Sequence, residues 1–83
     1  MLKLVYFASI REQLKCDEEQ LELSPSIKRV EDLVSLLSDR GAPWDKVLGG
    51  SQVLVAINQE MSQFDAVIND GDEVAFFPPV TGG

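Results

Sequence analysis

The fold is decided by residues 30–41, VEDLVSLLSDRG, which carry the strongest helix signal in the chain. Apolar side chains recur there at positions i, i+3, i+4 and i+7, the spacing of one helix face: Val30, Leu33, Val34 and Leu37. Glu31 and Asp32 would lie in the first turn, where the helix dipole favours acids. Gly41 suits the end of the helix. We therefore predict one main helix with a buried apolar stripe.

Two strand patterns precede this helix. Residues 2–8 are rich in β-branched and aromatic side chains, and residues 20–23 alternate between apolar and polar side chains. Between them, Ser9 and Glu12 have the spacing of a capping box, which predicts a short helical turn that ends near Lys15.

Three further strands are predicted after the helix: 53–57, 60–61 and 73–77. The first is almost entirely apolar, and we expect it to be buried on both faces. Turn residues at 58–59 and 69–72 precede the other two strands. Residues 41–51, around Trp44, are predicted to be irregular.

The order of the elements indicates the fold class. One sheet with one helix across one face buries both apolar surfaces, which gives a two-layer α+β domain. Because only one helix is available, the other face of the sheet stays partly open. Side chains alternate between the two faces of a strand, so Phe7 and Phe77 point to this open face if Lys3 is exposed and Phe76 is buried. An apolar patch on an acidic domain indicates a protein interface.

The composition limits the chemistry of the chain. Its 83 residues make one domain, and 45% apolar with 25% charged residues is typical of a globular protein. There is no His and one Cys, Cys16, so zinc sites built on thiolate or imidazole and Cys–His or Ser–His machinery are excluded within the chain. We expect no metal site, no internal disulfide and no conventional enzyme.

The charge excludes further classes of function. Fourteen acids against seven bases give a net charge of −7, which argues against binding to nucleic acid or anionic membranes. All seven bases precede Val47, and five acids follow it. This asymmetry is either a solvated acidic face or a face that attracts a basic partner. No run of aliphatic and aromatic residues exceeds five, so we expect no membrane span and a cytoplasmic location.

The chain ends in Pro78-Pro79-Val80-Thr81-Gly82-Gly83. The prolines hold the backbone extended, and the glycines remove every side chain from the end. One interpretation is a frayed terminus. The other is a terminus that enters the active site of another protein, because a glycine carboxylate passes a narrow tunnel and can be attacked without steric hindrance. We expect a domain of residues 1–77 and an extended tail of residues 78–83.

Three blocks of the sequence resemble the small, sulfur-carrying subunit of molybdopterin synthase, a ubiquitin-like β-grasp family. They are VYFA at 5–8 with Arg11-Glu12, VAINQ at 55–59, and DGDEVAFFPPVTGG at 70–83. The likeness extends over the whole chain, and the closing block is the most specific. It implies a β-grasp fold, with a mixed sheet of four to five strands and one main helix packed on one face. Arg29 departs from the family, whose members often have a capping Thr before the helix, at a cost of about 1 kcal/mol.

The resemblance also implies a role for the tail. An ATP-dependent, ubiquitin-activating-like adenylyltransferase would adenylate the carboxylate of Gly83. Sulfur from a persulfide would then displace AMP and leave a thiocarboxylate. With residues 78–81 as its stalk and Gly82 easing entry, the tail would insert into the large subunit of the synthase. There it would give sulfur to cyclic pyranopterin monophosphate and form the dithiolene of molybdopterin.

The partners implied by the resemblance follow from this sequence of steps. Two large and two small subunits would form a heterotetramer, and Phe7, Met61 and Phe77 would dock on both the large subunit and the activating enzyme. This chain would be a non-catalytic subunit without a cofactor of its own. ATP and Mg²⁺ would belong to the activating enzyme, and the pterin to the large subunit.

Four alternatives stay open. The chain could carry sulfur for another pathway, such as thiamin synthesis or tRNA thiolation. It could be a protein modifier that joins its terminus to lysine, or an interaction module in which the terminal glycines have no role. Finally, Cys16 could be a carrier thiol, although Lys15 is its only positively charged sequence neighbour that would lower its pKa.

Overall fold

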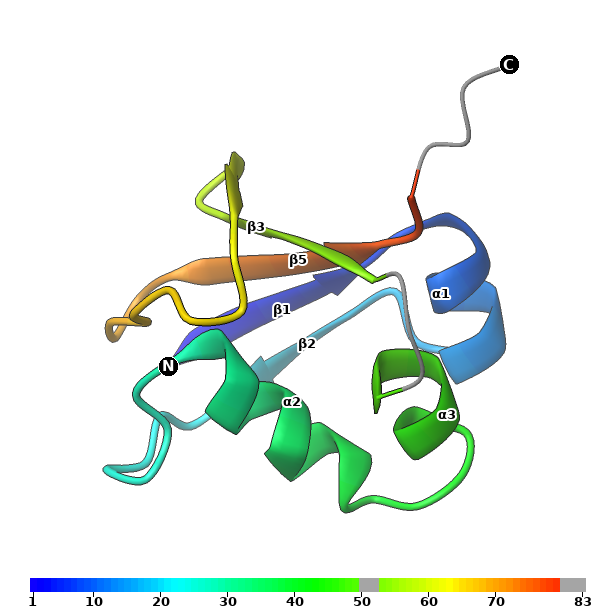
Figure 1. Ribbon diagram of the computed structural model, residues 1–83, viewed down its shortest axis with the longest axis horizontal. Helices are drawn as coiled ribbons and strands as arrows, with labels where there is room; N and C mark the ends of the chain where they lie inside the picture. Colours follow the sequence, from blue (N-terminus) through cyan, green and yellow to red (C-terminus); the bar gives the residue numbers. More distant parts are fainter. Residues whose placement is uncertain (50–52, 80–83) are drawn as a thin grey trace.

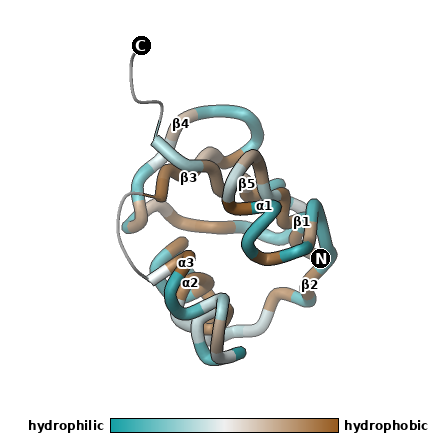
Figure 2. Tube along the Cα trace, turned by 90° about the vertical axis from the view of Figure 1, so that its right-hand side faces the viewer, coloured by the Kyte–Doolittle hydropathy of each residue, from teal (hydrophilic) through white to brown (hydrophobic). Residues whose placement is uncertain are grey.

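The strands and the helices of this protein form two layers. The computed structural model describes residues 1–49 and 53–79. The helices and strands in that part of the chain are β1 (Leu2–Tyr6), α1 (Ala8–Leu14), β2 (Glu18–Leu21), α2 (Val30–Ser38), α3 (Trp44–Gly49), β3 (Leu54–Ile57), β4 (Glu60–Ser62) and β5 (Glu73–Phe77). Figure 1 shows α2 and α3 together below the strands, and Figure 2, turned by 90°, shows the same separation.

The sheet has the strand order β2-β1-β5-β3-β4. β1 and β5 run parallel, and the other neighbouring pairs are antiparallel. The predicted α+β fold, with a mixed sheet and one main helix packed on one face, is therefore confirmed with five strands. The division into a domain of residues 1–77 and a tail stays a prediction.

The core lies between the sheet and α2. The apolar stripe predicted for this helix is confirmed, because Val30, Leu33 and Leu37 are fully buried and Val34 packs against them. The sheet contributes the other half of the core: Leu2, Leu4, Tyr6, Val55, Val74 and Phe76. Each fully buried side chain of this size stabilises the fold by about 1.5–3 kcal/mol, so this face of the sheet is the one that folding must cover.

The start of α2 is capped without a threonine. Arg29 is the N-cap residue, and its side chain has no acceptor for the first helical amides. Asp32 supplies the reciprocal half of a capping box, because its Oδ2 accepts from the backbone amides of Lys28 and Arg29, each at 3.0 Å. These two bonds lower the pKa of Asp32. The departure at Arg29 therefore removes only one half of the cap.

The capping box predicted at Ser9 is wrong. α1 begins directly after β1, and Phe7 is its N-cap residue without a side-chain cap. The amides of Ile10 and Arg11 donate to the carbonyl oxygen of Phe7 at 3.1 and 3.3 Å. Phe7, the residue that follows the strand, thus starts the helix, and Ser9 lies inside the helix. The predicted end near Lys15 is confirmed, since Lys15 is the C-cap residue with φ of 55°.

The second strand lies two residues earlier than its alternating pattern predicted. β2 pairs with β1 from Leu2↔Leu21 to Val5↔Glu18, so the register of β1 sets its bounds. The strand predicted at 53–57 is β3, which begins at Leu54. Its two central residues are buried and its two ends are half-buried, so burial on both faces is confirmed only for the centre.

The irregular structure predicted for residues 41–51 is wrong for the six residues of α3. Leu48 is buried, and Trp44 and Val47 pack against the core. A helix of six residues is too short to show a helical period in the sequence. Packing against α2 stabilises α3, and only the tertiary structure shows that contact.

The two predicted turns are confirmed. Asn58 and Gln59 have φ of 51° and 70°, the left-handed pair that a tight hairpin turn requires, and Gly71 has φ of 91°. The side chain of Asn58 joins the turns: its amide donates to Asp72 at 3.0 Å, and its oxygen accepts from the amide of Glu73 at 3.0 Å.

Candidate functional site

The face of the sheet turned away from α2 carries an apolar patch. Across this face, Val5 is paired with Ala75, Ala75 with Ala56, and Ala56 with Met61. In the next row Leu54 is paired with Phe77. Directly paired residues point to the same side of a sheet. We call the following residues the open-face patch: Val5, Phe7, Leu54, Ala56, Met61, Ala75 and Phe77.

The predicted orientation of the two phenylalanines is confirmed. Phe7 is 45% exposed and Met61 is 64% exposed, while Phe77 is half-buried. Ala56 and Ala75, which belong to the same face, are buried. Two alanines in one row leave a shallow floor beside larger side chains, a shape that a partner's side chains can fill.

Charged side chains surround the open-face patch. Lys3 and Glu73 are paired across β1 and β5, and Lys3 Nζ lies 3.9 Å from Glu18. Glu60 is exposed at the edge strand β4. An apolar centre with a polar rim is the usual anatomy of a protein–protein interface. This rim carries more acids than bases, in line with the expectation of a basic partner.

The tail leaves the sheet beside this patch. Pro78 and Pro79 follow Phe77 directly and are half-buried. The other tail residues that sequence reasoning singled out, Val80, Thr81, Gly82 and Gly83, lie outside the described residues.

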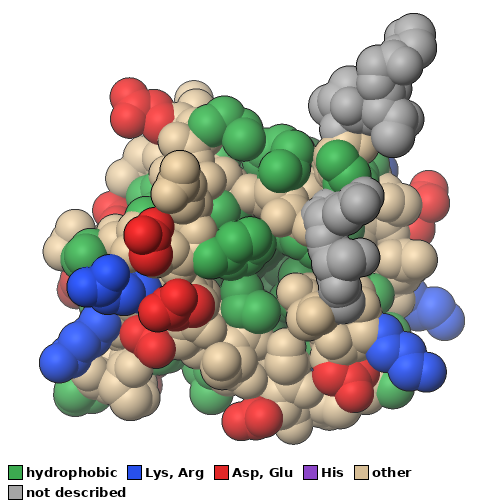
Figure 3. All heavy atoms as spheres, viewed as in Figure 1, with side chains coloured by type: hydrophobic (Ala, Val, Ile, Leu, Met, Phe, Trp, Pro, Cys, Tyr) green, Lys and Arg blue, Asp and Glu red, His purple; other side chains and the backbone are tan. Residues whose placement is uncertain are grey.

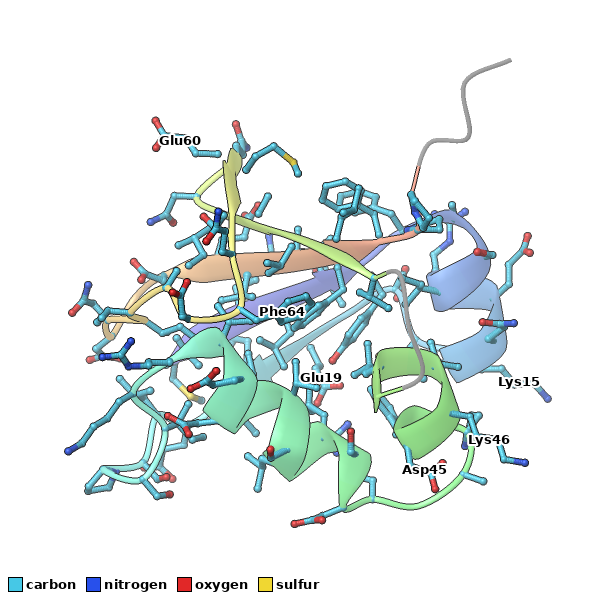
Figure 4. All side chains as sticks on the ribbon, in the orientation of Figure 1. Lys15, Glu19, Asp45, Lys46, Glu60 and Phe64 are labelled. Carbon is cyan, nitrogen blue, oxygen red and sulfur yellow. The ribbon has the colours of Figure 1, made fainter. Side chains whose placement is uncertain are left out.

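A groove of about 240 Å³ adjoins the root of the tail. It is lined by residues of α1, of α3 and of the segments that flank them: Ser9, Ile10, Gln13, Lys46, Val47, Val53 and Pro78. Figure 4 shows Lys46 on α3 and Lys15, the C-cap residue of α1, at this same end of the molecule. The groove beside the root of the tail is therefore lined by four apolar, two polar and one basic side chain.

Sequence reasoning missed an aromatic and ionic cluster that includes Phe76, near the end of β5. Tyr6 stacks on Phe76 with 6.0 Å between ring centroids and meets Trp44 edge-on at 5.6 Å. The hydroxyl of Tyr6 donates to Glu19 at 3.1 Å. Arg40 donates twice to Glu19, at 3.0 and 2.8 Å, and lies 4.4 Å from the centre of the Trp44 ring. The five residues join β1, β2, β5, α3 and the end of α2.

Burial and charge shift the pKa values of groups in this cluster and of Cys16 beside it. The bonds from Arg40 lower the pKa of Glu19. Burial, together with the charge of Glu19, raises the pKa of the Tyr6 hydroxyl well above its usual range. Burial and the charge of Glu19 likewise raise the pKa of the Cys16 thiol. Cys16 is therefore held in its unreactive protonated form, which argues against a carrier thiol at this position.

Replacing Glu19 by Gln should weaken the pH dependence of stability. Because the folded state lowers the pKa of Glu19, its contribution is present above the unfolded value of about 4.3 and is lost as the pH falls through the folded value. We expect Glu19→Gln to cost about 1 kcal/mol at pH 7, since solvent screens the partly exposed pair. Urea denaturation between pH 3 and 7 measures this. Glu12→Gln, at an exposed position on α1, is the control, and parallel curves for wild type and Glu19→Gln would contradict the prediction.

Cys16 should react slowly, and it should not be needed for the loading of sulfur on Gly83 that the resemblance implies. We expect its alkylation by iodoacetamide at pH 8 to be at least about threefold slower than that of a free cysteine. Glu19→Gln should accelerate the reaction, because it removes the charge that disfavours the thiolate. Cys16→Ala should leave the loading of Gly83 unchanged. If Cys16→Ala abolishes loading, Cys16 takes part in the carrier chemistry after all.

A larger groove of about 410 Å³ lies between α2, the end of α3 and the loop that follows β4. Figure 3 shows a hollow with hydrophobic side chains around it, and Figure 4 places Phe64 above α2 beside it. Its lining is mostly apolar: Glu31, Val34, Ser35, Leu48, Gly49, Val53 and Phe64. It opens on the helix side of the sheet.

Within residues 1–49 and 53–79, no three His, Cys, Asp or Glu side chains are grouped so that they could hold a metal ion. Over the same ranges, no helix has the length and apolarity needed to cross a membrane.

Comparison with known proteins assigns the family. The model of the ThiS family matches residues 4–83. The chain belongs to the ThiS family. It is 39% identical over 84 residues to the molybdopterin synthase sulfur carrier subunit of Escherichia coli K12, and 40% identical over 83 residues to that of Haemophilus influenzae. Each alignment covers 100% of both chains. The resemblance predicted from the sequence is thus confirmed.

One solved structure of this fold contains a partner. It is the complex of subunits 1 and 2 of the molybdopterin-converting factor from Helicobacter pylori, with a TM-score of 0.68 over 99% of this chain and 97% of that one. At 20% identity, this likeness bears on the fold alone. It agrees with the ubiquitin-like β-grasp topology of the ThiS family member described here.

Proposed function

We propose that this protein carries sulfur for molybdenum cofactor synthesis, as the small subunit of molybdopterin synthase. The observation that carries the proposal is full-length identity of 39–40% to two subunits of that name. The geometry supports it, because the tail begins where the open-face patch ends, at Phe77 and Pro78. A partner that binds the patch would therefore receive the tail at the same time.

The reactive group in this proposal is the carboxylate of Gly83. One of its oxygens attacks the α-phosphate of ATP in the activating enzyme, and pyrophosphate leaves. A persulfide then attacks the acyl-adenylate carbonyl with its terminal sulfur, and AMP leaves. A second thiol breaks the S–S bond of the resulting acyl disulfide and forms a disulfide with the donor cysteine, so that a thiocarboxylate remains on Gly83. In the synthase, this sulfur is transferred to the pterin precursor. The glycines allow close approach to the carbonyl, since neither presents a Cβ.

In this proposal, side chains of the domain bind the partner proteins and direct the tail. Phe7, Met61 and Phe77 contact the large subunit and, in turn, the activating enzyme. Pro78 and Pro79 direct the tail away from the sheet, because each proline fixes its own φ and restricts the residue before it. Neither role requires proton transfer, so the chain acts as a carried substrate and the partners supply catalysis. We expect two copies of each subunit in the synthase.

Sulfur loading of the terminus tests this proposal. The protein is incubated with the activating enzyme, ATP and a sulfur donor, and its intact mass is measured. We expect one oxygen to be replaced by sulfur. No Lys or Arg follows Lys46, so a protease that cleaves after glutamate is used to separate residues 74–83 from the rest. An unchanged mass with active components would overturn the proposal.

The choice of pathway needs a second measurement. A tagged copy of the protein is purified from its own cells, and the proteins that accompany it are identified. Recovery of the large subunit of molybdopterin synthase supports the proposal. Recovery of a thiazole synthase would assign the carrier to thiamin synthesis, and lysine-linked conjugates would assign it to protein modification.

A further inference from the structure

The open-face patch contains one oxidisable sulfur atom. The chain has two methionines, and both are exposed, Met61 at 64% and Met1 at 60%. Met61 is paired with Ala56 on β3, so its side chain shares the face of the open-face patch. Met1 lies before β1, where its amino group contacts Asp70 and its carbonyl oxygen accepts from Gly71. Only one of the two thioethers therefore lies on the proposed docking surface.

The surroundings of Met61 would not tolerate a polar group at an interface. Its paired neighbour is an alanine, and the adjacent positions of β3 on this face are Leu54 and Asn58. The side-chain amide of Asn58 is already bonded to Asp72 and Glu73. An added oxygen on the sulfur would therefore lie beside apolar side chains at Ala56 and Leu54 and an already bonded amide at Asn58. A polar atom that loses water without gaining a hydrogen bond opposes binding.

We propose that Met61 is an oxidation site that controls docking of the carrier. A peroxide transfers one oxygen to the thioether: the O–O bond breaks, an S–O bond forms, the sulfur is oxidised to the sulfoxide, and the peroxide is reduced to water. The product is polar and stiffer than methionine, and sulfoxide reductases can reverse the reaction. This inference rests on the proposed function, since it names a modification of the surface that binds the large subunit.

Binding of a partner would change the access of peroxide to Met61. Met61 is accessible in the free carrier, whereas a bound partner would cover it together with Phe77. The row of paired residues that contains Met61 ends at Val5. Met1 lies about four residues before Val5 along the chain, so a partner on the open-face patch leaves Met1 exposed. Docking should therefore slow the oxidation of Met61 and leave that of Met1 unchanged.

The experiment uses the full chain in a Cys16→Ala background, which removes the thiol as a second target. The carrier alone is treated with hydrogen peroxide, the peroxide is removed, and binding to the large subunit is measured by calorimetry. Cleavage after Glu12, Glu60 and Glu73 places the two methionines and the tail in separate peptides. This separation is needed because addition of an oxygen and exchange of oxygen for sulfur change the mass almost equally.

We expect the sulfoxide form to bind at least about tenfold more weakly. Met61→Leu keeps an apolar side chain without sulfur, and its own affinity before treatment is the reference. Peroxide treatment should leave that affinity unchanged, although Met1 is still oxidised. Met61→Gln should imitate the oxidised form. Equal affinity of the oxidised and untreated wild type would overturn the inference alone. Failure of the untreated protein to bind the large subunit would overturn the proposed function, and the inference with it.

Discussion

A chain that ends at Gly82 is expected to lose sulfur transfer, although it still ends in a glycine carboxylate. Removing Gly83 shortens the tail by about 3.5 Å and leaves the chemistry of the terminus unchanged. Because a displacement of 1 Å at a reacting centre can cost about 100-fold, we expect the rate of loading to fall by at least that factor. Single-turnover formation of the acyl-adenylate, followed by intact mass, measures the effect.

Two variants distinguish the effect of the length of the tail from the effect of its terminal residue. Gly83→Ala keeps the length of the tail and adds a Cβ beside the reacting carbonyl, so it should also load poorly. Thr81→Ser keeps both length and terminus and should load at the wild-type rate. If the chain that ends at Gly82 loads normally, the terminal residue is not the acceptor of sulfur, and the interaction-module alternative gains support.

Phe77→Asp is expected to abolish binding to the large subunit while the isolated domain stays folded. The side chain lies where the open-face patch meets the tail, opposite Leu54, and it is half-buried in the free protein. An aspartate there would bury an unpaired charge at the interface. Losses at aromatic anchors of an interface reach about 2–4 kcal/mol, which corresponds to at least about 30-fold weaker binding.

A matched control is available on the other layer. Leu36 on α2 is 42% exposed, close to the 45% of Phe7, but lies on the helix that covers the opposite side of the sheet. Leu36→Asp should therefore bind the large subunit normally. Calorimetry of both variants, with circular dichroism melts to confirm folding, makes the comparison. Normal binding by Phe77→Asp would show that the open-face patch is not the docking surface.

Much of the architecture could be predicted from short-range patterns. The stripe of α2, the turn before β5 and the outward direction of Phe7 and Phe77 follow from periods of 3.6 and 2, which local sequence encodes. The same patterns gave wrong bounds for β2 and a wrong cap for α1. Pairing with β1 sets the bounds of β2, and that pairing joins residues that no local pattern relates. The start of α1 is set by the end of β1, since Phe7, the residue after the strand, is the N-cap.

The sequence by itself determined the chemical character of this protein. With no His and one Cys, it excludes zinc sites built on thiolate or imidazole and Cys–His or Ser–His machinery within the chain. The stretch at residues 30–41 already required a sheet to cover its apolar stripe. The tertiary structure decided which distant side chains meet. α3, the Glu19–Arg40 pair and the row from Met61 to Val5 exist because distant segments pack together. Side-chain contacts between such segments depend on the folded backbone, which brings them within a few ångströms of each other.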